Sequence, residues 1–312
     1  MEIASRIYIA GHHGMVGSAF LRKLQQQKYQ NLILRSRQEL DLRNQAAVES
    51  FFRKEQPEYV LLAAAKVGGI QANQLYPADF LYDNLMIQTN VLHQAYSTGV
   101  KKLLQVGSSC VYPRECPQPM KEEYLLTGPL EPTNEAYAVA KIAGLKMAYF
   151  YAVQYGVRFI SLMASNLYGP GDSFDPESSH VLSALVKKFV DAVEEGRKTV
   201  TIWGTGHARR EFLHVDDLAE AVLLVMDRWE SPSILNVGSG TDISIKELAE
   251  LIADRVGFRG DLFWDGTKPD GMPRKLLDIS KITALGFQPK ITLTEGIEQV
   301  IREYRLYHRR DH

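Results

Sequence analysis

The sequence predicts an α/β protein with a doubly wound parallel sheet and a smaller C-terminal α/β lobe. Two observations lead to this fold class. Apolar runs of strand length alternate with longer segments of helical period over the first half of the chain, and this alternation is typical of consecutive β-α-β units. After residue 170 the pattern is broken by frequent prolines and glycines, which marks a lobe of different construction.

The strands expected in the parallel sheet are runs rich in aliphatic side chains, at residues 6–10, 31–34, 59–65, 102–107 and 158–163. Helices are expected between or after them, near residues 15–27, 44–54, 76–98 and 137–155. Parallel strands need long crossover connections, and helices of this length supply them. At 312 residues the chain is long for one domain. We therefore predict a first domain over 1–170 and a lobe over 171–312, some segments of which return to the first domain.

The composition is that of an ordinary folded protein, with 45% hydrophobic and 23% charged residues. Its 36 basic residues nearly balance 37 acidic ones, which gives no support for a nucleic-acid partner. The two cysteines are too few for a disulfide framework, the first residues lack a secretory pattern, and no apolar run is long enough to cross a bilayer. We therefore expect a cytoplasmic, reduced protein without a membrane partner. No spacing of ligating side chains is typical of a metal site, so no metal is expected.

A glycine-rich turn, with Gly11, Gly14 and Gly17, joins the first strand to an amphipathic helix. Glycines at such a turn let the backbone approach a pyrophosphate, which binds at the helix N-terminus because free N–H groups and the helix dipole favour an anion there. The alternative is a tight turn without a ligand. In a chain of β-α-β units the motif favours a Rossmann dinucleotide-binding domain over 1–170, which leaves 171–312 as mainly a substrate-binding lobe.

The end of the second strand bears on which nicotinamide cofactor binds. An acidic residue about 20 positions after the glycine loop commonly bonds the ribose 2′-OH of NAD. Here the chain has Arg35 and Arg37 instead. A guanidinium can pair with the 2′-phosphate of NADP, whereas a carboxylate would repel it. The expected cofactor is therefore NADP(H), and the alternative for these arginines is a solvated loop.

A second group of residues indicates redox chemistry. Tyr137 and Lys141 are spaced to share one helix face, although this spacing also occurs by chance on solvated helix faces. A phenol has an ordinary pKa of about 10, so we expect the Lys141 ammonium to lower it for proton transfer at neutral pH. Ser108 ends the fourth strand, at the edge of the sheet where ligands bind. If the extended geometry persists, Ser108 and Cys110 point the same way while Ser109 points back, and Ser108 can bond a substrate carbonyl beside Tyr137.

The glycine turn, Ser108 and the Tyr137/Lys141 pair, in this order, resemble the extended short-chain dehydrogenase/reductase family, which works on nucleotide sugars. GSSCVYP at 107–113 and SSHV at 178–181 resemble more narrowly the branch that makes GDP-L-fucose. The resemblance covers nearly the whole chain. It implies that a GDP-linked keto-deoxy sugar, GDP-4-keto-6-deoxy-D-mannose, is epimerised at C3 and C5 and then reduced at C4 by NADPH.

The resemblance also assigns the site residues. It implies catalytic roles for Ser108, Cys110, Tyr137, Lys141 and His180. It implies cofactor contacts for Gly11, His13, Gly14, Met15, Val16, Gly17, Arg37, Asp41, Ala64, Lys141, Asn166, Leu167 and His180. It implies substrate contacts for Lys188, Trp203, Arg210 and Lys275. The family commonly has Arg where this chain has His13, and this departure puts the strength of the NADP preference in doubt.

Cys110 and His180 are the epimerising pair that the resemblance implies. A ketone at C4 acidifies the C–H bonds at C3 and C5, so inversion needs a base on one face of the sugar and an acid on the other. From the residues alone, Cys110 is equally interpreted as a small core residue and His180 as a surface histidine that caps the helix 181–195. Residues 175–179 resemble a helix cap, and the helix dipole is expected to lower the pKa of the His180 imidazole.

The implied substrate residues come from separate segments. Lys188, Arg210 and Lys275 would converge on the diphosphate of an anionic substrate, although each is also interpretable as a solvated surface charge. Trp203 would form a wall of the sugar pocket, although a Trp in a strand is more often packed.

Two alternatives to this function stay open. One is another nucleotide-sugar enzyme of the family, but a dehydratase is expected to carry an Asp-Glu pair where this chain has Cys110 and Val111, and a 4-epimerase usually has an acid after the second strand. The other is a non-catalytic dinucleotide sensor, a class that commonly loses the tyrosine or the lysine.

We also predict a homodimer. The segment Lys146–Tyr151 is apolar around most of its helix, so both faces should be covered. The resemblance pairs this helix with the one near 76–98 across a two-fold axis, where Phe80, Leu81, Leu85 and Val91 would contribute the second surface.

Overall fold

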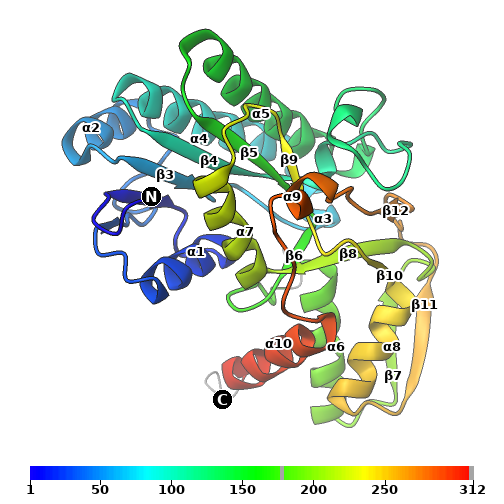
Figure 1. The fold of residues 1–312 in the computed structure, drawn as a ribbon. Helices are drawn as coiled ribbons and strands as arrows, with labels where there is room; N and C mark the ends of the chain where they lie inside the picture. The colour runs from blue at the N-terminus through cyan, green and yellow to red at the C-terminus, as the bar shows by residue number, and fades with distance from the viewer. Residues whose placement is uncertain (176–178, 309–312) are drawn as a thin grey trace.

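The computed structural model describes residues 1–175 and 179–308, and it has a parallel sheet with helices on both faces (Figure 1). Within these residues, six strands are hydrogen-bonded in the order β2-β1-β3-β4-β5-β9. All their pairings are parallel. Their bounds are β1 Ile7–Ala10, β2 Leu32–Ile33, β3 Tyr59–Leu62, β4 Lys102–Ser108, β5 Phe159–Ala164 and β9 Leu235–Val237. The predicted fold class is confirmed.

Two helical layers enclose this sheet (Figure 1). On one face α1 (Met15–Gln26) packs against α7 (Val215–Arg228). On the other face α4 (Pro77–Ser97) packs between α2 (Gln45–Glu55) and α5 (Glu135–Tyr155). Every residue of β1 and β5 is buried, because side chains on both faces of these strands meet a helical layer. This explains why the strands are continuous apolar runs rather than alternating patterns.

The position of the ligand site follows from the strand order. The chain continues from β1 to β2 on one side and reaches β3 on the other, so the sheet has a switch point between β1 and β3. In open parallel sheets, ligands bind beyond the carboxyl ends of the strands at such a point. Gly11 follows β1 there with φ of +88°, and a Cβ on it would lie 2.7 Å from the Ala64 nitrogen. A Cβ on Gly17 would lie 2.1 Å from the Gly11 oxygen, so the turn requires glycine at both positions.

A smaller α/β unit adjoins the carboxyl edge of the sheet. Strand β8 lies between β10 and β12 and also pairs with β6, while β7 pairs with β11. Helices α6, α8 and α10 pack with these strands around a separate apolar cluster. The bounds are β6 Asn166–Tyr168, α6 Val181–Glu194, β7 Thr199–Trp203, β8 Arg209–His214, β10 Asp242–Ser244, α8 Ile245–Val256, β11 Asp261–Asp265, β12 Arg274–Lys275 and α10 Leu293–His308.

The two units are not separated by one cut in the chain. Both β9 and α7 follow residue 170 but belong to the large sheet and its helical cover. The described residues also include the short α-helices α3 (Ile70–Leu75) and α9 (Ser280–Ala284). The boundary at residue 170 stays a prediction.

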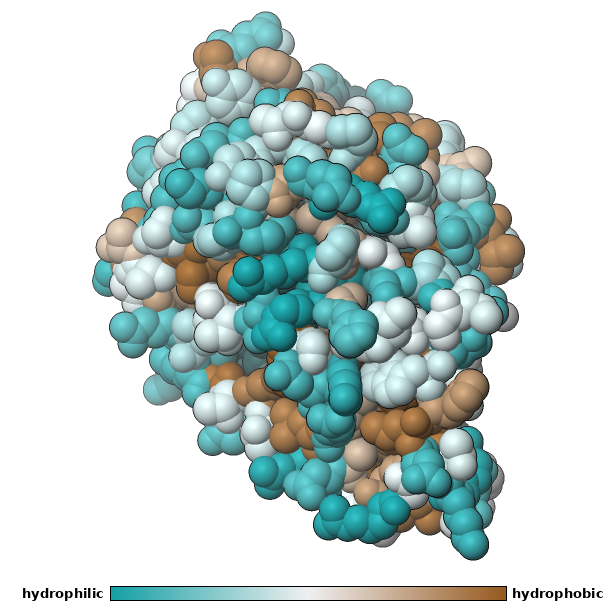
Figure 2. Space-filling model, turned by 90° about the vertical axis from the view of Figure 1, so that its right-hand side faces the viewer, coloured by the Kyte–Doolittle hydropathy of each residue, from teal (hydrophilic) through white to brown (hydrophobic). Residues whose placement is uncertain are grey.

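The surface beside β10 and β11 is mainly hydrophilic across its middle, with hydrophobic side chains gathered lower, over the smaller unit (Figure 2). On β11, Phe263 is 60% exposed. Exposed apolar side chains of this kind are common on folded proteins. In the described part of the chain, no helix is both long enough and apolar enough to span a membrane.

Candidate active site

A pocket of about 1510 Å³ opens at the carboxyl ends of the strands and extends along the smaller unit. Every residue that the sequence assigned to catalysis, cofactor or substrate lines this pocket. The glycine turn forms one end, the residues after β4 and α5 form the middle, and β7, β8 and β12 contribute the other end. The fold therefore brings together residues from position 11 to position 275.

The glycine turn offers an anion a backbone surface. Gly14 is the N-cap of α1, has extended backbone and leaves the cap without a side-chain hydrogen bond. A Cβ on Gly14 would meet only the Gly11 oxygen, at 3.5 Å, so the backbone faces open space. Met15 and Val16 continue the same wall of the pocket. This arrangement fits a pyrophosphate at the N-terminus of α1.

Arg35 and Arg37 have different surroundings. Arg35 donates to the Glu55 carboxylate at 2.7 Å, and its guanidinium lies 5.8 Å from the centre of the Phe51 ring. Arg37 is exposed and, among the residues that the structure describes, no hydrogen bond or ion pair engages it. Arg37 is therefore the arginine available to a 2′-phosphate. His13 is also exposed at this end of the pocket.

Asp41 is a neighbouring negative charge, and Arg43 binds it. The Arg43 guanidinium donates to both carboxylate oxygens, at 2.6 Å for the shortest contact. These hydrogen bonds lower the pKa of Asp41 to about 2, so the carboxylate is ionised at neutral pH. Arg43 compensates the negative charge of Asp41. In the described residues Asp41 therefore forms its ion pair with Arg43 and not with Arg37.

Ser108 and Cys110 lie at the end of β4. Residues Ser109–Val111 form a 3-10 turn, η1, in which the Cys110 N–H donates to Ser108 Oγ at 3.3 Å. The extended geometry therefore does not persist past Ser108. Ser108 and Cys110 still line the pocket together, while Ser109 is buried. The 3-10 turn, and not the alternation of side chains along a strand, gives the three residues these orientations. Cys110 is thus a pocket residue rather than a core residue.

The Cys110 thiol lies beside Lys275. The Lys275 Nζ donates to Cys110 Sγ at 3.3 Å. Burial acts to raise the pKa of the Cys110 thiol, but Lys275, Ser108 and His180 together lower it below its usual value. The resemblance implied that Lys275 contacts the diphosphate of the substrate, whereas the structure places its ammonium at the thiol.

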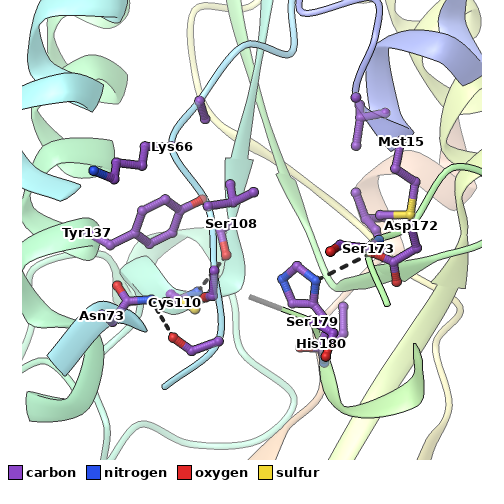
Figure 3. A pocket seen from close by; sticks show the side chains of 18 of the residues that line it. Met15, Lys66, Asn73, Ser108, Cys110, Tyr137, Asp172, Ser173, Ser179 and His180 are labelled. Atoms are coloured by element: carbon purple, nitrogen blue, oxygen red, sulfur yellow. Dashed lines mark hydrogen bonds and ion pairs between the residues drawn. The ribbon is translucent and has the colours of Figure 1, made fainter. Parts of the chain in front are cut away.

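Tyr137 lies beside Ser108, and Lys141 follows one turn later on α5 (Figure 3). Lys141 donates to the Val106 oxygen at 3.1 Å, and burial lowers its pKa to about 8. Its Nζ is 5.9 Å from the centre of the Tyr137 ring. The expectation that Lys141 lowers the pKa of the phenol is wrong here: burial and the nearby Cys110 raise the pKa of Tyr137. At neutral pH the phenol is protonated, which is the state that a proton donor needs.

His180 lies across the pocket from Ser108, Cys110 and Tyr137 (Figure 3). Its Nδ1 is 3.8 Å from Asp172 Oδ1. The expected lowering of its pKa is wrong, because Asp172 raises the pKa of the imidazole against the effect of burial, and Cys110 adds to the rise. Asp172 is itself held by the Ser183 hydroxyl and by the Ser173 N–H at 2.8 Å.

The predicted helix cap at 175–179 cannot be followed throughout, since 176–178 lie outside the described residues. His180 is the N-cap residue of α6, but its side chain makes no capping hydrogen bond. Its ring instead faces Asp172 and the pocket. The interpretation of His180 as a mere surface cap is therefore wrong.

Basic and aromatic side chains form the end of the pocket nearest β7. Trp203 is 49% exposed, so it is not packed in the core. The ammonium groups of Lys188 and Lys268 lie 5.9 and 5.2 Å from the centre of its ring. Arg210 donates to the backbone oxygen of Asp270 at 3.0 Å and keeps its place in the wall. Cations around an exposed aromatic ring suit an anionic ligand with a ring to stack.

Known proteins place this chain in a family. Residues 7–238 match the family model described as "NAD dependent epimerase/dehydratase family". The chain belongs to the NAD-dependent epimerase/dehydratase family. Its relatives include "GDP-L-fucose synthase 1" of Arabidopsis thaliana, 56% identical over 96% of this chain and 93% of the relative. "GDP-L-fucose synthase" of Escherichia coli (strain K12) is 50% identical over 94% of each chain. The resemblance drawn from the motifs is confirmed.

Solved structures of the family have the same fold. A GDP-L-fucose synthetase from Naegleria fowleri bound to NADP is 28% identical, with a TM-score of 0.90 over 99% of this chain and 96% of that one. A GDP-6-OMe-4-keto-L-xylo-heptose reductase from C. jejuni is 41% identical, with a TM-score of 0.93 over 99% of each chain. The family therefore includes structures named for reduction as well as a synthetase.

Two contacts in the site were missed from the sequence. Asp172, the partner of His180, is the last residue of the motif SNLYGPGD at 165–172. The motif identifies the residue, but it does not show that the carboxylate points toward His180. The contact between Lys275 and Cys110 joins residues 165 positions apart, and no local pattern predicts it.

Proposed function

We propose that this protein converts GDP-4-keto-6-deoxy-D-mannose to GDP-L-fucose by epimerisation at C3 and C5 and NADPH-dependent reduction at C4. The observation that carries the proposal is the placement of Cys110 and His180 across one pocket, beside Ser108 and Tyr137. The names of relatives at 50–57% identity support the substrate. The family member from Naegleria fowleri supports NADP as the cofactor.

Epimerisation uses the two groups that face each other. The Cys110 thiolate takes a proton from the carbon next to the C4 ketone, so an S–H bond forms and the C–H electron pair moves toward the C4 oxygen. The hydroxyls of Ser108 and Tyr137 donate to that oxygen and stabilise its negative charge. The protonated His180 imidazole, which Asp172 favours by raising its pKa, then returns a proton to the opposite face of the carbon. The configuration of that carbon is inverted.

Reduction uses the other half of the pocket. The glycine turn, Arg37 and Asn166 would hold the cofactor, which supplies a hydride for C4 when it is bound. Tyr137 gives its phenolic proton to the C4 oxygen, completing the hydroxyl group. Ser108 positions the oxygen, and Lys141, fixed to the Val106 carbonyl, holds a positive charge beside the phenol that becomes anionic.

The substrate assignment is tested by offering keto sugars on different nucleotides. With NADPH and the GDP-linked 4-keto-6-deoxy sugar, we expect loss of NADPH absorbance and formation of a 6-deoxyhexose on GDP. With the corresponding dTDP- or UDP-linked keto sugar we expect little reaction. Oxidation of NADPH with the dTDP or UDP sugar alone would overturn the assignment.

Another nucleotide-sugar epimerase or reductase of the family is the second candidate. The similarity to the GDP-6-OMe-4-keto-L-xylo-heptose reductase from C. jejuni, at 41% identity, favours a reaction with reduction alone. Cys110 and His180 favour epimerisation as well, because reduction uses neither a thiolate base nor an imidazolium on the opposite face.

The NADPH preference is expected to depend on Arg37. Arg37→Asp should weaken NADPH binding by about 10- to 100-fold, because a charged hydrogen-bond donor to the 2′-phosphate is lost and a repulsive charge takes its place. NADH binding should change much less. Arg35→Ala is the matched control, since Arg35 is engaged by Glu55 and should affect both cofactors alike. Equal losses for the two cofactors on Arg37→Asp would mean that this residue does not read the phosphate.

We also propose a homodimer built on α4 and α5. On α5, Val139, Phe150 and Val153 are 43%, 58% and 61% exposed, which leaves an apolar stripe along the helix. Part of the predicted second surface is wrong, because Phe80 and Val91 are buried by their own chain. Leu81 and Leu85 are half-buried and remain able to contribute.

The dimer is tested by sedimentation of the wild type and of Phe150→Glu. We expect a dimer for the wild type and a monomer for the variant, because Phe150 is 58% exposed on its own chain and a glutamate there would place a charge in the apolar interface. Lys54→Glu, at an exposed position on α2, is a control for added charge. A wild-type protein that stays monomeric at micromolar concentration contradicts the proposal.

A further inference from the structure

We propose that Lys275 is a positioning residue for epimerisation: its ammonium holds Cys110 as the thiolate that removes the sugar proton. The proposal rests on the proposed function and deepens it. The resemblance assigned Lys275 to the diphosphate of the substrate, whereas the proposal assigns it to the reacting thiol.

The geometry around the thiol carries the inference. Lys275 Nζ lies 3.3 Å from Cys110 Sγ, and the Lys275 residue is 8% exposed. Among the described residues, no carboxylate forms an ion pair with Lys275. A buried ammonium is costly unless an opposite charge or several acceptors compensate it. A thiolate at Cys110 provides that compensation, so each charge stabilises the other.

The groups that face Cys110 from other elements do not oppose this arrangement. His180 comes from the start of α6 and Arg210 from β8, and both are cations when protonated. Tyr137 from α5 is neutral at neutral pH because its pKa is raised. Ser108 contributes a neutral hydroxyl from the end of β4. The thiolate therefore lies in a mainly cationic environment, in which Lys275 makes the direct contact.

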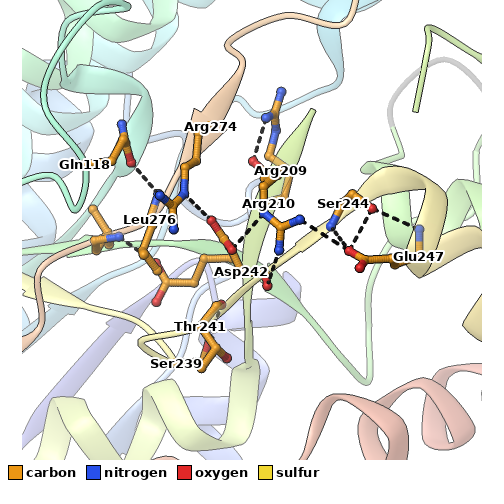
Figure 4. A network of polar contacts seen from close by, with 12 residues as sticks. Gln118, Arg209, Arg210, Ser239, Thr241, Asp242, Ser244, Glu247, Arg274 and Leu276 are labelled. Atoms are coloured by element: carbon orange, nitrogen blue, oxygen red, sulfur yellow. Dashed lines mark hydrogen bonds and ion pairs between the residues drawn. The ribbon is translucent and has the colours of Figure 1, made fainter. Parts of the chain in front are cut away.

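The backbone on both sides of Lys275 is fixed (Figure 4). Arg274 is ion-paired with Asp242, which also accepts from Arg209 at 3.0 Å. The Leu276 N–H donates to Gln118 Oε1 at 3.0 Å. The next N–H, that of Leu277, donates to the buried Glu211 carboxylate at 2.9 Å. These contacts fix the backbone from which the Lys275 side chain starts, and so favour a constant position for its ammonium beside Cys110.

Lys188 is better placed than Lys275 for the diphosphate. Its ammonium lies near the exposed Trp203 ring and donates to the Thr201 oxygen at 2.9 Å. No thiol or catalytic hydroxyl is among its contacts in the described part of the chain. The two lysines therefore have different roles: Lys188 contacts the anionic substrate, and Lys275 contacts the thiolate base.

Lys275 neither gains nor loses a proton when Cys110 takes the proton from the sugar. The C–H bond breaks and an S–H bond forms, the electron pair moves to the C4 oxygen, and the ammonium keeps its proton. A nearby positive charge favours the thiolate over the thiol. Removing Lys275 should therefore raise the pH at which Cys110 ionises, and the base form should be lost at neutral pH and regained as the pH rises.

The test measures the thiol itself, without substrate. Since Cys116 is the other cysteine of the chain, the full-length Cys116→Ser protein leaves one thiol, and its alkylation rate by iodoacetamide is followed against pH. We expect Lys275→Met to move the midpoint upward and to slow alkylation at neutral pH at least about tenfold. Lys275→Arg should restore most of the rate. Lys188→Met, the matched control, should leave the midpoint unchanged.

An unchanged midpoint in Lys275→Met would overturn the proposal, whatever happens to turnover. If Lys275→Met does not fold, the Cys116→Ser protein alone still decides: a Cys110 midpoint at or above that of free cysteine contradicts a thiolate held by Lys275. A second readout is deuterium uptake by the keto sugar, which should recover at high pH in Lys275→Met. A shifted thiol midpoint without any turnover of the GDP-linked sugar would refute the proposed function but not the contact.

Discussion

Cys110→Ala is expected to slow deuterium exchange at C3 and C5 of the keto sugar by about 10²- to 10⁴-fold, the usual contribution of a positioned base. Hydride transfer to the unepimerised ketone should persist at a residual rate, because Ser108, Tyr137 and Lys141 are untouched. The structure explains the expected loss of exchange. Among the described residues near Ser108, the Cys110 thiol is the group that contacts the Lys275 ammonium and lies opposite His180, so its removal leaves the pocket without this base. The measurement is mass spectrometry of the sugar after incubation in deuterated water, with NADPH oxidation recorded in parallel.

The control for this substitution is Cys116→Ser, which changes a thiol outside the pocket lining. It should retain both exchange and reduction. Full exchange in Cys110→Ala would show that the thiol is not the base, and the epimerase half of the proposed function would lose its main support.

Tyr137→Phe is expected to have the reverse effect. NADPH oxidation should fall by about 10²- to 10⁴-fold because the proton donor to the C4 oxygen is removed. Exchange at C3 and C5 should be slowed much less, since Cys110, His180 and the Ser108 hydroxyl remain. Steady-state oxidation of NADPH and deuterium uptake, measured on the same sample, separate the two reactions.

Tyr149→Phe is a matched control on the same helix, because Tyr149 is 39% exposed and outside the pocket lining. It should leave both reactions unchanged. Equal loss of exchange and reduction in Tyr137→Phe would indicate that the Tyr137 hydroxyl is as essential to epimerisation as to reduction, and it would contradict the proposal that Cys110, His180 and Ser108 sustain proton exchange without it.

The large sheet was predictable because its strands are buried on both faces. Such strands are continuous apolar runs, and those at β1, β3, β4 and β5 stand out from the helical segments between them. The last strand of the sheet, β9, was not assigned, because a three-residue run after a broken stretch has no periodicity to identify it. Its place beside β5 depends on tertiary pairing alone.

The membership of the pocket was also predictable, but its electrostatics were not. Motif residues such as Ser108, Tyr137 and His180 were found by spacing and resemblance, and all line one cavity. Their protonation depends on partners distant in sequence or across a loop: Asp172 reverses the expected shift at His180, and burial reverses the one at Tyr137. A sequence pattern gives the residue types but not these distances.

The apolar side chains of α4 are another case in which the sequence gives the residue types but not their contacts. The resemblance assigned Phe80 and Val91 to a surface shared between two subunits, but the sequence does not show which partner buries them. In the structure their own chain does so, whereas Phe150 on α5 remains exposed.

The most direct test of the central claim is the wild-type reaction in deuterated water with NADPH and GDP-4-keto-6-deoxy-D-mannose. We expect GDP-L-fucose that carries deuterium at both C3 and C5, because each carbon loses its proton to Cys110 and regains one from solvent through His180. A reduced GDP sugar with the original configuration and hydrogen at both carbons would contradict it, and would identify the protein as a C4 reductase alone.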